Sequence, residues 1–210
     1  MVLFMFRIFL MLSMILFFSF NSAYCAAENK SLPAITQAIP ITELIGYADY
    51  PSNVKQLISK AFVLSEKNLT YLYGSSDPKN GGMDCSGTIY YLLSNMTHSN
   101  MPRDANEMYN WVKRDGKIHD VTHHDFNALK PGDLLFWSGT YRSHPARSIT
   151  HVMLYLGKNK NHEPLMFGSS DGRTYKGVKM WGVSVFDFKL PSEKDKARFV
   201  AYGCIPSLTC

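Results

Sequence analysis

The sequence predicts an α+β fold in which N-terminal helices pack on a central antiparallel β-sheet. Between residues 52 and 111, apolar residues recur at spacings of three and four, which is the period of an amphipathic helix. After residue 130 the pattern changes to short β-rich runs that are separated by turn residues. A block of helices followed by a block of strands is typical of α+β domains, whereas βαβ folds alternate the two.

The first helix is expected to begin at Ser52, directly after Pro51, and to stop by Asn68. One face of this segment carries the apolar residues Val54, Leu57, Ile58, Ala61, Phe62 and Leu64. Such a stripe indicates a helix that buries one side against a core.

Two further helices follow a long turn. Residues 71–87 are crowded with Gly, Asn, Pro and Asp, and the second helix is expected to begin at Cys85 or Ser86 at the end of this turn. Asp104, with a glutamate three residues later, resembles a capping box that opens a third helix through Trp111.

Five β-rich runs make up the rest of the chain. They comprise residues 134–137, 151–156, 164–167, 183–188 and 198–205. Their short length and the turn residues between them predict an antiparallel sheet.

The N-terminus reads as a secretory signal. Arg7 precedes a continuous apolar run, and small residues follow it, so that cleavage after Cys25 or Ala27 fits the pattern. We therefore expect a signal peptide over residues 1–27, an arm or linker over 28–50 and one domain over 51–210. The protein is expected to be exported to the periplasm or cell envelope, without a stable membrane span after processing; a retained anchor is the alternative.

Composition and charge exclude several classes of protein. The chain is 46% hydrophobic and 19% charged, which indicates a globular rather than a disordered protein. Loss of the signal removes only Arg7 and lowers the net charge from +5 to +4. No Lys/Arg cluster is dense enough for a nucleic-acid partner, although a mildly basic surface favours approach to an anionic polymer.

The cysteine count singles out one thiol. Without Cys25, the chain keeps Cys85, Cys204 and Cys210, and the last two could close a small loop across CIPSLTC. Cys85 would then stay unpaired in an oxidising compartment, where a free thiol or an intermolecular bond follows from an odd count. Catalysis is one reason to keep such a thiol; an inert buried cysteine is the alternative.

A turn that delivers Cys85 to the start of a helix suits nucleophilic catalysis. Unpaired N–H groups and the helix dipole are expected to lower the pKa of its thiol there. Among seven histidines, His151 is the one that begins a predicted strand, which would hold its imidazole in a fixed direction. We expect Cys85 and His151 to form a nucleophile and base pair.

Four segments resemble the NlpC family of cell-wall cysteine peptidases in their order and spacing. They read MDCSGTIYYLL, MPRDANEMYNW, LKPGDLLFW and HVMLYLG, and the resemblance spans about residues 54–190. It implies a papain-like fold and hydrolysis of peptide bonds in peptidoglycan stem peptides. No metal or other cofactor is expected.

The resemblance also assigns roles to residues. Cys85 matches the nucleophile and His151 the general base, while the residues that match the receivers of the substrate are Tyr71, Asp84 and Ser86. The third polar residue, which would orient the imidazole, falls near Phe167. Ser169 lies next on the same face and is the candidate for this third catalytic position; a water or a backbone carbonyl that orients the imidazole is the alternative.

Three alternatives remain open at this point. A metal site is one, because the residues His119, Asp120, His123, His124 and Asp125 are close in sequence, although the segment does not read as a helix. A second is a catalytically weak or inactive wall-binding protein with the same fold. A third is an amidase or acyltransferase that uses the same Cys/His pair.

Overall fold

A computed structural model describes residues 32–94, 96–97, 101–121, 126–140 and 148–210. The chain separates into two compact units, and the second, which begins at Ser31 and ends at Cys210, contains all of these residues. The predicted signal peptide over residues 1–27 lies outside the described part. Within that part, no helix has both the length and the apolar character needed to cross a membrane.

The three predicted helices are present. They are α1 (Ser52–Ser65), α2 (Cys85–Leu93) and α3 (Ala105–Asp115). Asp104 caps α3 as predicted, because its Oδ1 accepts hydrogen bonds from the N–H groups of Asn106 (2.8 Å) and Glu107 (3.3 Å). Three 3₁₀ turns add to them, namely η1 (Ile41–Glu43), η2 (Tyr47–Asp49) and η3 (Pro78–Asn80).

Six strands form an antiparallel sheet in the order β3-β8-β4-β5-β6-β7. Their bounds are β3 (Lys117–Asp120), β4 (Leu134–Ser138), β5 (Ile149–Lys158), β6 (Pro164–Tyr175), β7 (Val178–Asp187) and β8 (Arg198–Cys204). A separate parallel pair joins β1 (Thr70–Tyr71) to β2 (Gly82–Met83). All five predicted β-rich runs fall on strands of the large sheet, and the α+β prediction is confirmed.

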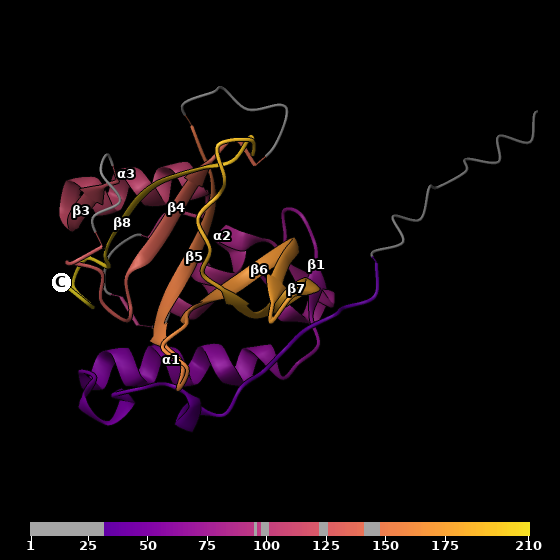
Figure 1. The fold of residues 1–210 in the computed structure, drawn as a ribbon. Coiled ribbons are helices and arrows are strands. Elements are labelled where there is room, and N and C mark those ends of the chain that lie inside the picture. Colours follow the sequence, from indigo (N-terminus) through magenta and orange to yellow (C-terminus); the bar gives the residue numbers. More distant parts are fainter. Residues whose placement is uncertain (1–31, 95, 98–100, 122–125, 141–147) are drawn as a thin grey trace, which may run out of the picture. The chain divides into compact units, whose positions relative to one another are not determined.

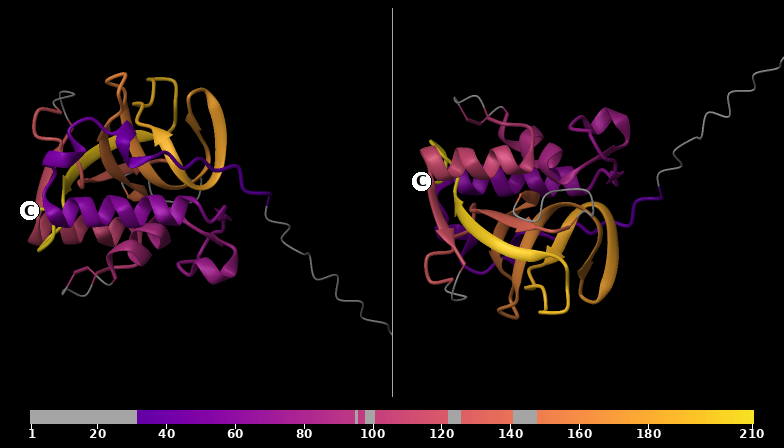
Figure 2. Two further views of the ribbon diagram at one scale, coloured as in Figure 1. Left: turned by 90° about the horizontal axis from the view of Figure 1, so that it is seen from below. Right: turned by 90° about the horizontal axis from the view of Figure 1, so that it is seen from above.

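The helices gather on one side of the sheet, as the two views of Figure 2 show. Figure 1 shows α2 behind the central strands β5 and β6. The core between the layers contains large side chains that are almost fully buried, among them Trp111, Phe136 and Phe167. This packing fixes the start of α2 against the middle of the sheet.

Strand β3 was not predicted, because its residues are mostly polar and it lies at the edge of the sheet. Two members of the proposed metal cluster belong to it. His119 stacks on the ring of Tyr202 at 5.0 Å, and Asp120 accepts a 3.3 Å hydrogen bond from the hydroxyl of Tyr109. The other three members, residues 123–125, lie outside the described residues. Among the residues that are described, no group of three His, Cys, Asp or Glu is placed to hold a metal ion.

Both ends of the described domain are tied to its body. In the N-terminal arm, Ile35 forms a bridge to Trp181 of β7, and Leu44 forms one to Asn159. At the C-terminus, Cys204 and Cys210 form the disulfide that the sequence allowed. Cys85 is the free cysteine of the described part.

Candidate active site

Cys85 is the first residue of α2, at the end of the Gly-rich turn. The turn fits closely around it: a Cβ added to Gly87 would lie 2.1 Å from the carbonyl oxygen of Ser75. Cys85 itself is 4% exposed. The sequence therefore places this thiol at a helix N-terminus as predicted, but in a buried position.

Asp84 is the N-cap of α2 and holds the turn together. Its Oδ1 accepts a hydrogen bond from the N–H of Gly87 (2.6 Å), and its Oδ2 accepts one from the N–H of Gly74 (2.8 Å). The guanidinium of Arg103 adds a salt bridge to Oδ2 at 2.9 Å and donates to the hydroxyl of Ser86 at 2.9 Å. The sequence pattern did not identify Arg103 as part of the site, although it directly precedes the capping Asp104. Its salt bridge means that the Asp84 carboxylate already has a cationic partner.

His151 is the third residue of β5, which begins at Ile149 and not at His151 as predicted. Its imidazole is 4% exposed and lies edge-on to the ring of Trp137, with ring centroids 5.7 Å apart. Trp137 lies directly opposite His151 on β4. Two neighbouring strands thus fix the direction of the imidazole.

The start of α2 packs against the strand that carries His151. The backbone N–H of Val152, the next residue of β5, makes a hydrogen bond to the Cys85 thiol, as does the N–H of Ser86. The structure therefore places the start of α2, with Cys85, against the strand that carries His151.

Burial dominates the electrostatics of both groups. Burial first, and the charge of Asp84 second, raise the pKa of the Cys85 thiol from 9.0 to about 12. The two N–H groups and Arg103 lower that pKa by less. Burial also lowers the pKa of His151 well below its usual value, and the charge of Arg173 acts in the same direction. The expected low thiol pKa was wrong, because desolvation outweighs the helix N-terminus; the free protein holds a neutral thiol and a neutral imidazole.

Arg173 contacts His151 and was missed by the sequence reasoning. Its Nε donates a hydrogen bond to His151 Nε2 at 3.3 Å, and its guanidinium lies over the Trp137 ring at 4.2 Å from the centroid. The residue sits where the register of β6 against β7 shifts, between Asp171 and Thr174. Such a bulge turns a side chain in a direction that strict alternation does not give.

Ser169, the predicted third residue, is fully buried on β6. Its hydroxyl donates a 2.6 Å hydrogen bond to the carbonyl oxygen of Met83, two residues before Cys85. Phe167, at the matching position, belongs to the hydrophobic core. In the described structure the side chain that meets the imidazole Nε2 is therefore Arg173 and not Ser169.

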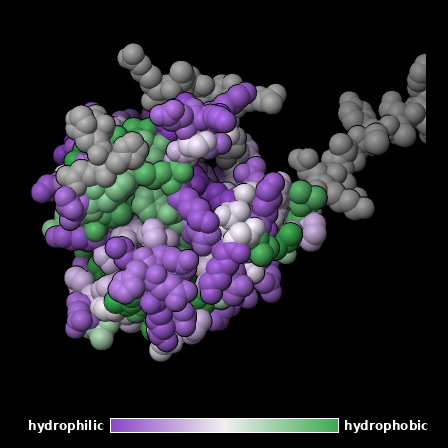
Figure 3. All heavy atoms as spheres, viewed as in Figure 1, coloured by the Kyte–Doolittle hydropathy of each residue, from purple (hydrophilic) through white to green (hydrophobic). Residues whose placement is uncertain are grey.

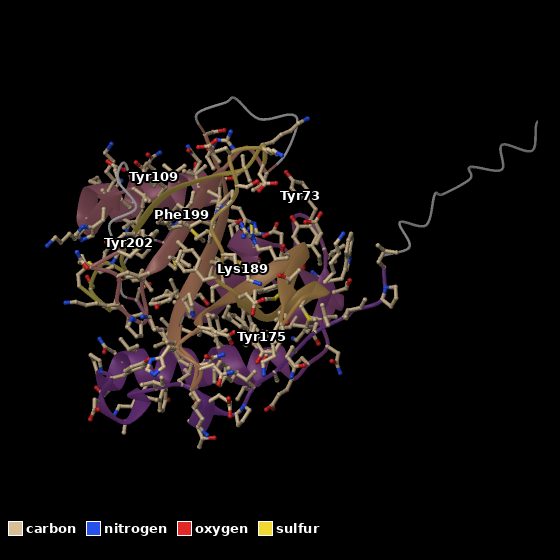
Figure 4. The ribbon with its side chains drawn as sticks, viewed as in Figure 1. Tyr73, Tyr109, Tyr175, Lys189, Phe199 and Tyr202 are labelled. Carbon is tan, nitrogen blue, oxygen red and sulfur yellow. A yellow bond between two sulfur atoms is a disulfide. The ribbon has the colours of Figure 1, made fainter. Side chains whose placement is uncertain are left out.

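Two clefts flank the Cys85–His151 pair. The Asp84 cleft has a volume of about 460 Å³, and its lining includes Tyr71, Asp84, Cys85, Ser86, Arg103 and Ile149. The Arg173 cleft has a volume of about 850 Å³, and its lining includes His151, Arg173, Lys179, Asp187, Lys189 and Lys196. Figures 3 and 4 show the molecule from the same side, and Figure 4 labels Lys189 of this cleft and Phe199. In Figure 3 the surface at the position of Lys189 is hydrophilic, and it borders an apolar area at the position of Phe199.

Comparison with known families gives one match to this region. The sequence profile of the NlpC/P60 family matches residues 68–176, which is just over half of the chain. The matched stretch contains Cys85, His151 and every residue assigned above to the Asp84 cleft.

Three curated relatives are similar over part of the chain. Murein DD-endopeptidase MepH of Escherichia coli is 34% identical over 90 residues, which cover 43% of this chain and 29% of that protein. Probable endopeptidase YafL of Escherichia coli is 33% identical over 87 residues, or 41% and 30% of the two chains. Gamma-DL-glutamyl hydrolase of Bacillus subtilis is 27% identical over 128 residues, or 59% and 28%. The matched part thus spans less than a third of each of these relatives.

Solved structures are also similar. A lipoprotein-like NLP/P60-family protein of Staphylococcus aureus is 19% identical, with a TM-score of 0.49, and the match covers 75% of this chain and 43% of that one. The NlpC/p60 domain of peptidoglycan hydrolase SagA is 22% identical, with a TM-score of 0.42, and the match covers 64% and 88% of the two chains.

Proposed function

The chain belongs to the NlpC/P60 family, and from this premise we propose that it is an exported cysteine peptidase that hydrolyses peptide bonds in peptidoglycan stem peptides. The observation that carries the proposal is the position of Cys85. A free thiol starts a helix, lines a cleft and receives a hydrogen bond from the strand residue next to a buried histidine. The relatives described as endopeptidases support the same class of reaction.

The proposed reaction begins with a neutral pair. As the Cys85 sulfur attacks the scissile carbonyl carbon, His151 takes the thiol proton, and the carbonyl oxygen becomes an oxyanion. Because the pKa of the thiol is raised and that of His151 is lowered, transfer of the proton is unfavourable before substrate binds. Backbone N–H groups at the start of α2 are suited to stabilise the oxyanion.

The tetrahedral intermediate then collapses. The C–N bond breaks, His151 gives its proton to the leaving amine, and the acyl group stays on Cys85 as a thioester. Water, with its proton accepted by His151, attacks the thioester and releases the free carboxylate and the thiol. The same acyl-enzyme would serve an amidase or acyltransferase if an amine replaced water.

We assign reception of the amino-terminal part of the stem peptide to Tyr71, Asp84 and Ser86. All three line the cleft that contains Cys85. A substrate ammonium group would meet an Asp84 carboxylate already paired with Arg103, so Arg103 is expected to moderate its attraction. Ser169 would act on the nucleophile indirectly, by holding Met83 and hence the turn before Cys85.

A second candidate function is a wall-binding protein with little turnover. The contact between Arg173 and His151 favours it, because a guanidinium beside the imidazole opposes its protonation. Catalysis by His151 requires that protonated state, at least transiently.

One experiment separates the two functions. Wild-type protein, Cys85→Ala and His151→Ala would be incubated with purified cross-linked peptidoglycan, and mass spectrometry of the digest would identify any bond cut. We expect new amino termini with the wild-type protein and at least a 100-fold lower rate with either variant. Binding of the polymer by all three proteins without any cleavage would support the wall-binding function and exclude the peptidase. Lys176→Gln, which changes an exposed cation of the β6–β7 hairpin, is the control that should keep full activity.

A further inference from the structure

Arg173 carries a charge that forms no salt bridge with a described residue, although the Asp171 carboxylate is near enough to raise its pKa. No carboxylate in the described ranges lies within 4.0 Å of its guanidinium, and its Nε–H is the one polar hydrogen with a hydrogen-bond acceptor, His151 Nε2. The end of the side chain is enclosed by Trp137 and His151, although the residue as a whole is partly exposed. Enclosure lowers the pKa of Arg173 only to about 10, so the group remains a cation at neutral pH.

A desolvated cation without an anion is costly in free energy, and a bound anion would remove that cost. The free Nη groups of Arg173 present a planar set of donors, which fits the two oxygens of a carboxylate. The cleft beyond Arg173 is large enough for part of a peptide, at about 850 Å³. Lys179 and Lys196 line it as well, and no ion pair of either is found among the described residues.

The Arg173 cleft, which is also lined by Asp171, Asp187 and Asp195, is the second of the two clefts beside the reactive pair. Cys85 lines one cleft and His151 the other, so an extended peptide that crosses them would place its scissile bond between the two. We propose that Arg173 and the flanking lysines Lys179 and Lys196 form a subsite for a carboxylate of the leaving half of the substrate. This inference rests on the proposed function for the position of the scissile bond, and it adds the chemical group that the leaving half must carry.

Binding of the carboxylate would also affect the base. While Nε2 of the neutral imidazole accepts from Arg173, the proton of that imidazole is on Nδ1, so the ring has no free lone pair for the thiol proton. A carboxylate that pairs with Arg173 draws the guanidinium away from Nε2 and compensates its charge. His151 is then free to accept a proton, and the subsite links recognition of the substrate to activation of the base.

Equilibrium binding to the Cys85→Ala protein tests the subsite without catalysis. The probes are a peptidoglycan stem peptide with all carboxyl groups free and the same peptide amidated at each carboxyl group in turn. We expect amidation of one group to weaken binding by about tenfold or more, as for loss of a charge-assisted hydrogen-bond pair. In Cys85→Ala/Arg173→Gln this difference should disappear, whereas in Cys85→Ala/Lys176→Gln it should persist. Equal affinity for all the peptides would overturn the proposal even if the Arg173→Gln protein did not fold.

A chemical probe gives a second readout that needs no peptidoglycan. Iodoacetate and iodoacetamide both alkylate a thiolate with loss of iodide, but only the former carries a carboxylate. The rate of Cys85 alkylation by iodoacetate, divided by the rate with iodoacetamide, should fall several-fold in Arg173→Gln. The same ratio should be unchanged in Lys176→Gln. An unchanged ratio in Arg173→Gln would contradict the proposal. A wild-type protein that shows the peptide preference and this ratio, but cuts no bond, would refute the peptidase function and leave the subsite standing.

Discussion

The salt bridge between Arg103 and Asp84 offers a quantitative test of how the turn before α2 is held. The perturbation is Arg103→Met, which keeps a long apolar side chain and removes the charge. It deletes a 2.9 Å contact to a carboxylate that is 8% exposed, and a 2.9 Å hydrogen bond to Ser86. A hydrogen bond to a charged group contributes about 1.5–3 kcal/mol; because the Arg103 side chain is 33% exposed, solvent screening favours the lower part, about 1.5–2 kcal/mol.

That loss should lower the midpoint of thermal unfolding by roughly 3–8 °C for a domain of this size. A double-mutant cycle with Asp84→Asn isolates the pair, because asparagine still caps the helix while it removes the charge. We expect a coupling free energy of about 1–2 kcal/mol from urea unfolding of the four proteins. The exposed pair Arg114–Asp115 provides the matched control, and Arg114→Met should leave the midpoint unchanged.

Additive effects of Arg103→Met and Asp84→Asn would show that the two side chains do not stabilise the fold as a pair. So would a midpoint for Arg103→Met that equals that of Arg114→Met. Either result would mean that the hydrogen bonds of Asp84 to Gly74 and Gly87 hold the turn without the cation.

Three further predictions follow from the same region and its surroundings. The rate of Cys85 alkylation by iodoacetamide should keep rising above pH 9, because its thiol pKa is about 12; a plateau between about pH 5 and pH 8 would indicate a preformed thiolate instead. Gly87→Ala should destabilise the domain by about 3 kcal/mol in urea unfolding and abolish turnover, since its Cβ would meet the Ser75 carbonyl at 2.1 Å; unchanged stability would show that the turn can relax. Burial raises the pKa of Asp133 from 3.8 to about 6, so its folded form holds a proton that the unfolded form has lost, and stability should fall as the pH rises from about 4 to 6 by at most about 3 kcal/mol. Asp133→Asn should remove that fall, and an unaltered pH profile of the variant would contradict the assignment.

The parts of the fold that local patterns specify could be predicted from the sequence. The apolar face of α1, the turn before Cys85 and the cap at Asp104 each depend on neighbours within a few residues. Strand β3 could not be found in this way, because an edge strand with mostly polar residues has no alternating apolar face.

Only those residues of the candidate site that the pattern of their own segment indicates could be predicted from the sequence. Cys85 and His151 were identified from their own segments, but the partner of His151 was sought at Ser169 by counting along alternating strand positions. The bulge of β6 between Asp171 and Thr174 breaks that alternation and brings Arg173 to the imidazole. The raised pKa of the Cys85 thiol could not be predicted from the sequence either, because burial of Cys85 depends on how α2 packs against β5.

Titration of a single thiol tests the proposal that Cys85 is the nucleophile of a peptidoglycan hydrolase. The protein would be alkylated with iodoacetamide at raised pH for increasing times, and each sample would be divided between peptide mapping and the release of new amino termini from peptidoglycan at neutral pH. If Cys85 is the nucleophile, the fraction of activity lost should equal the fraction of Cys85 modified, down to no activity at full modification. Activity that persists when Cys85 is fully alkylated would contradict this proposal.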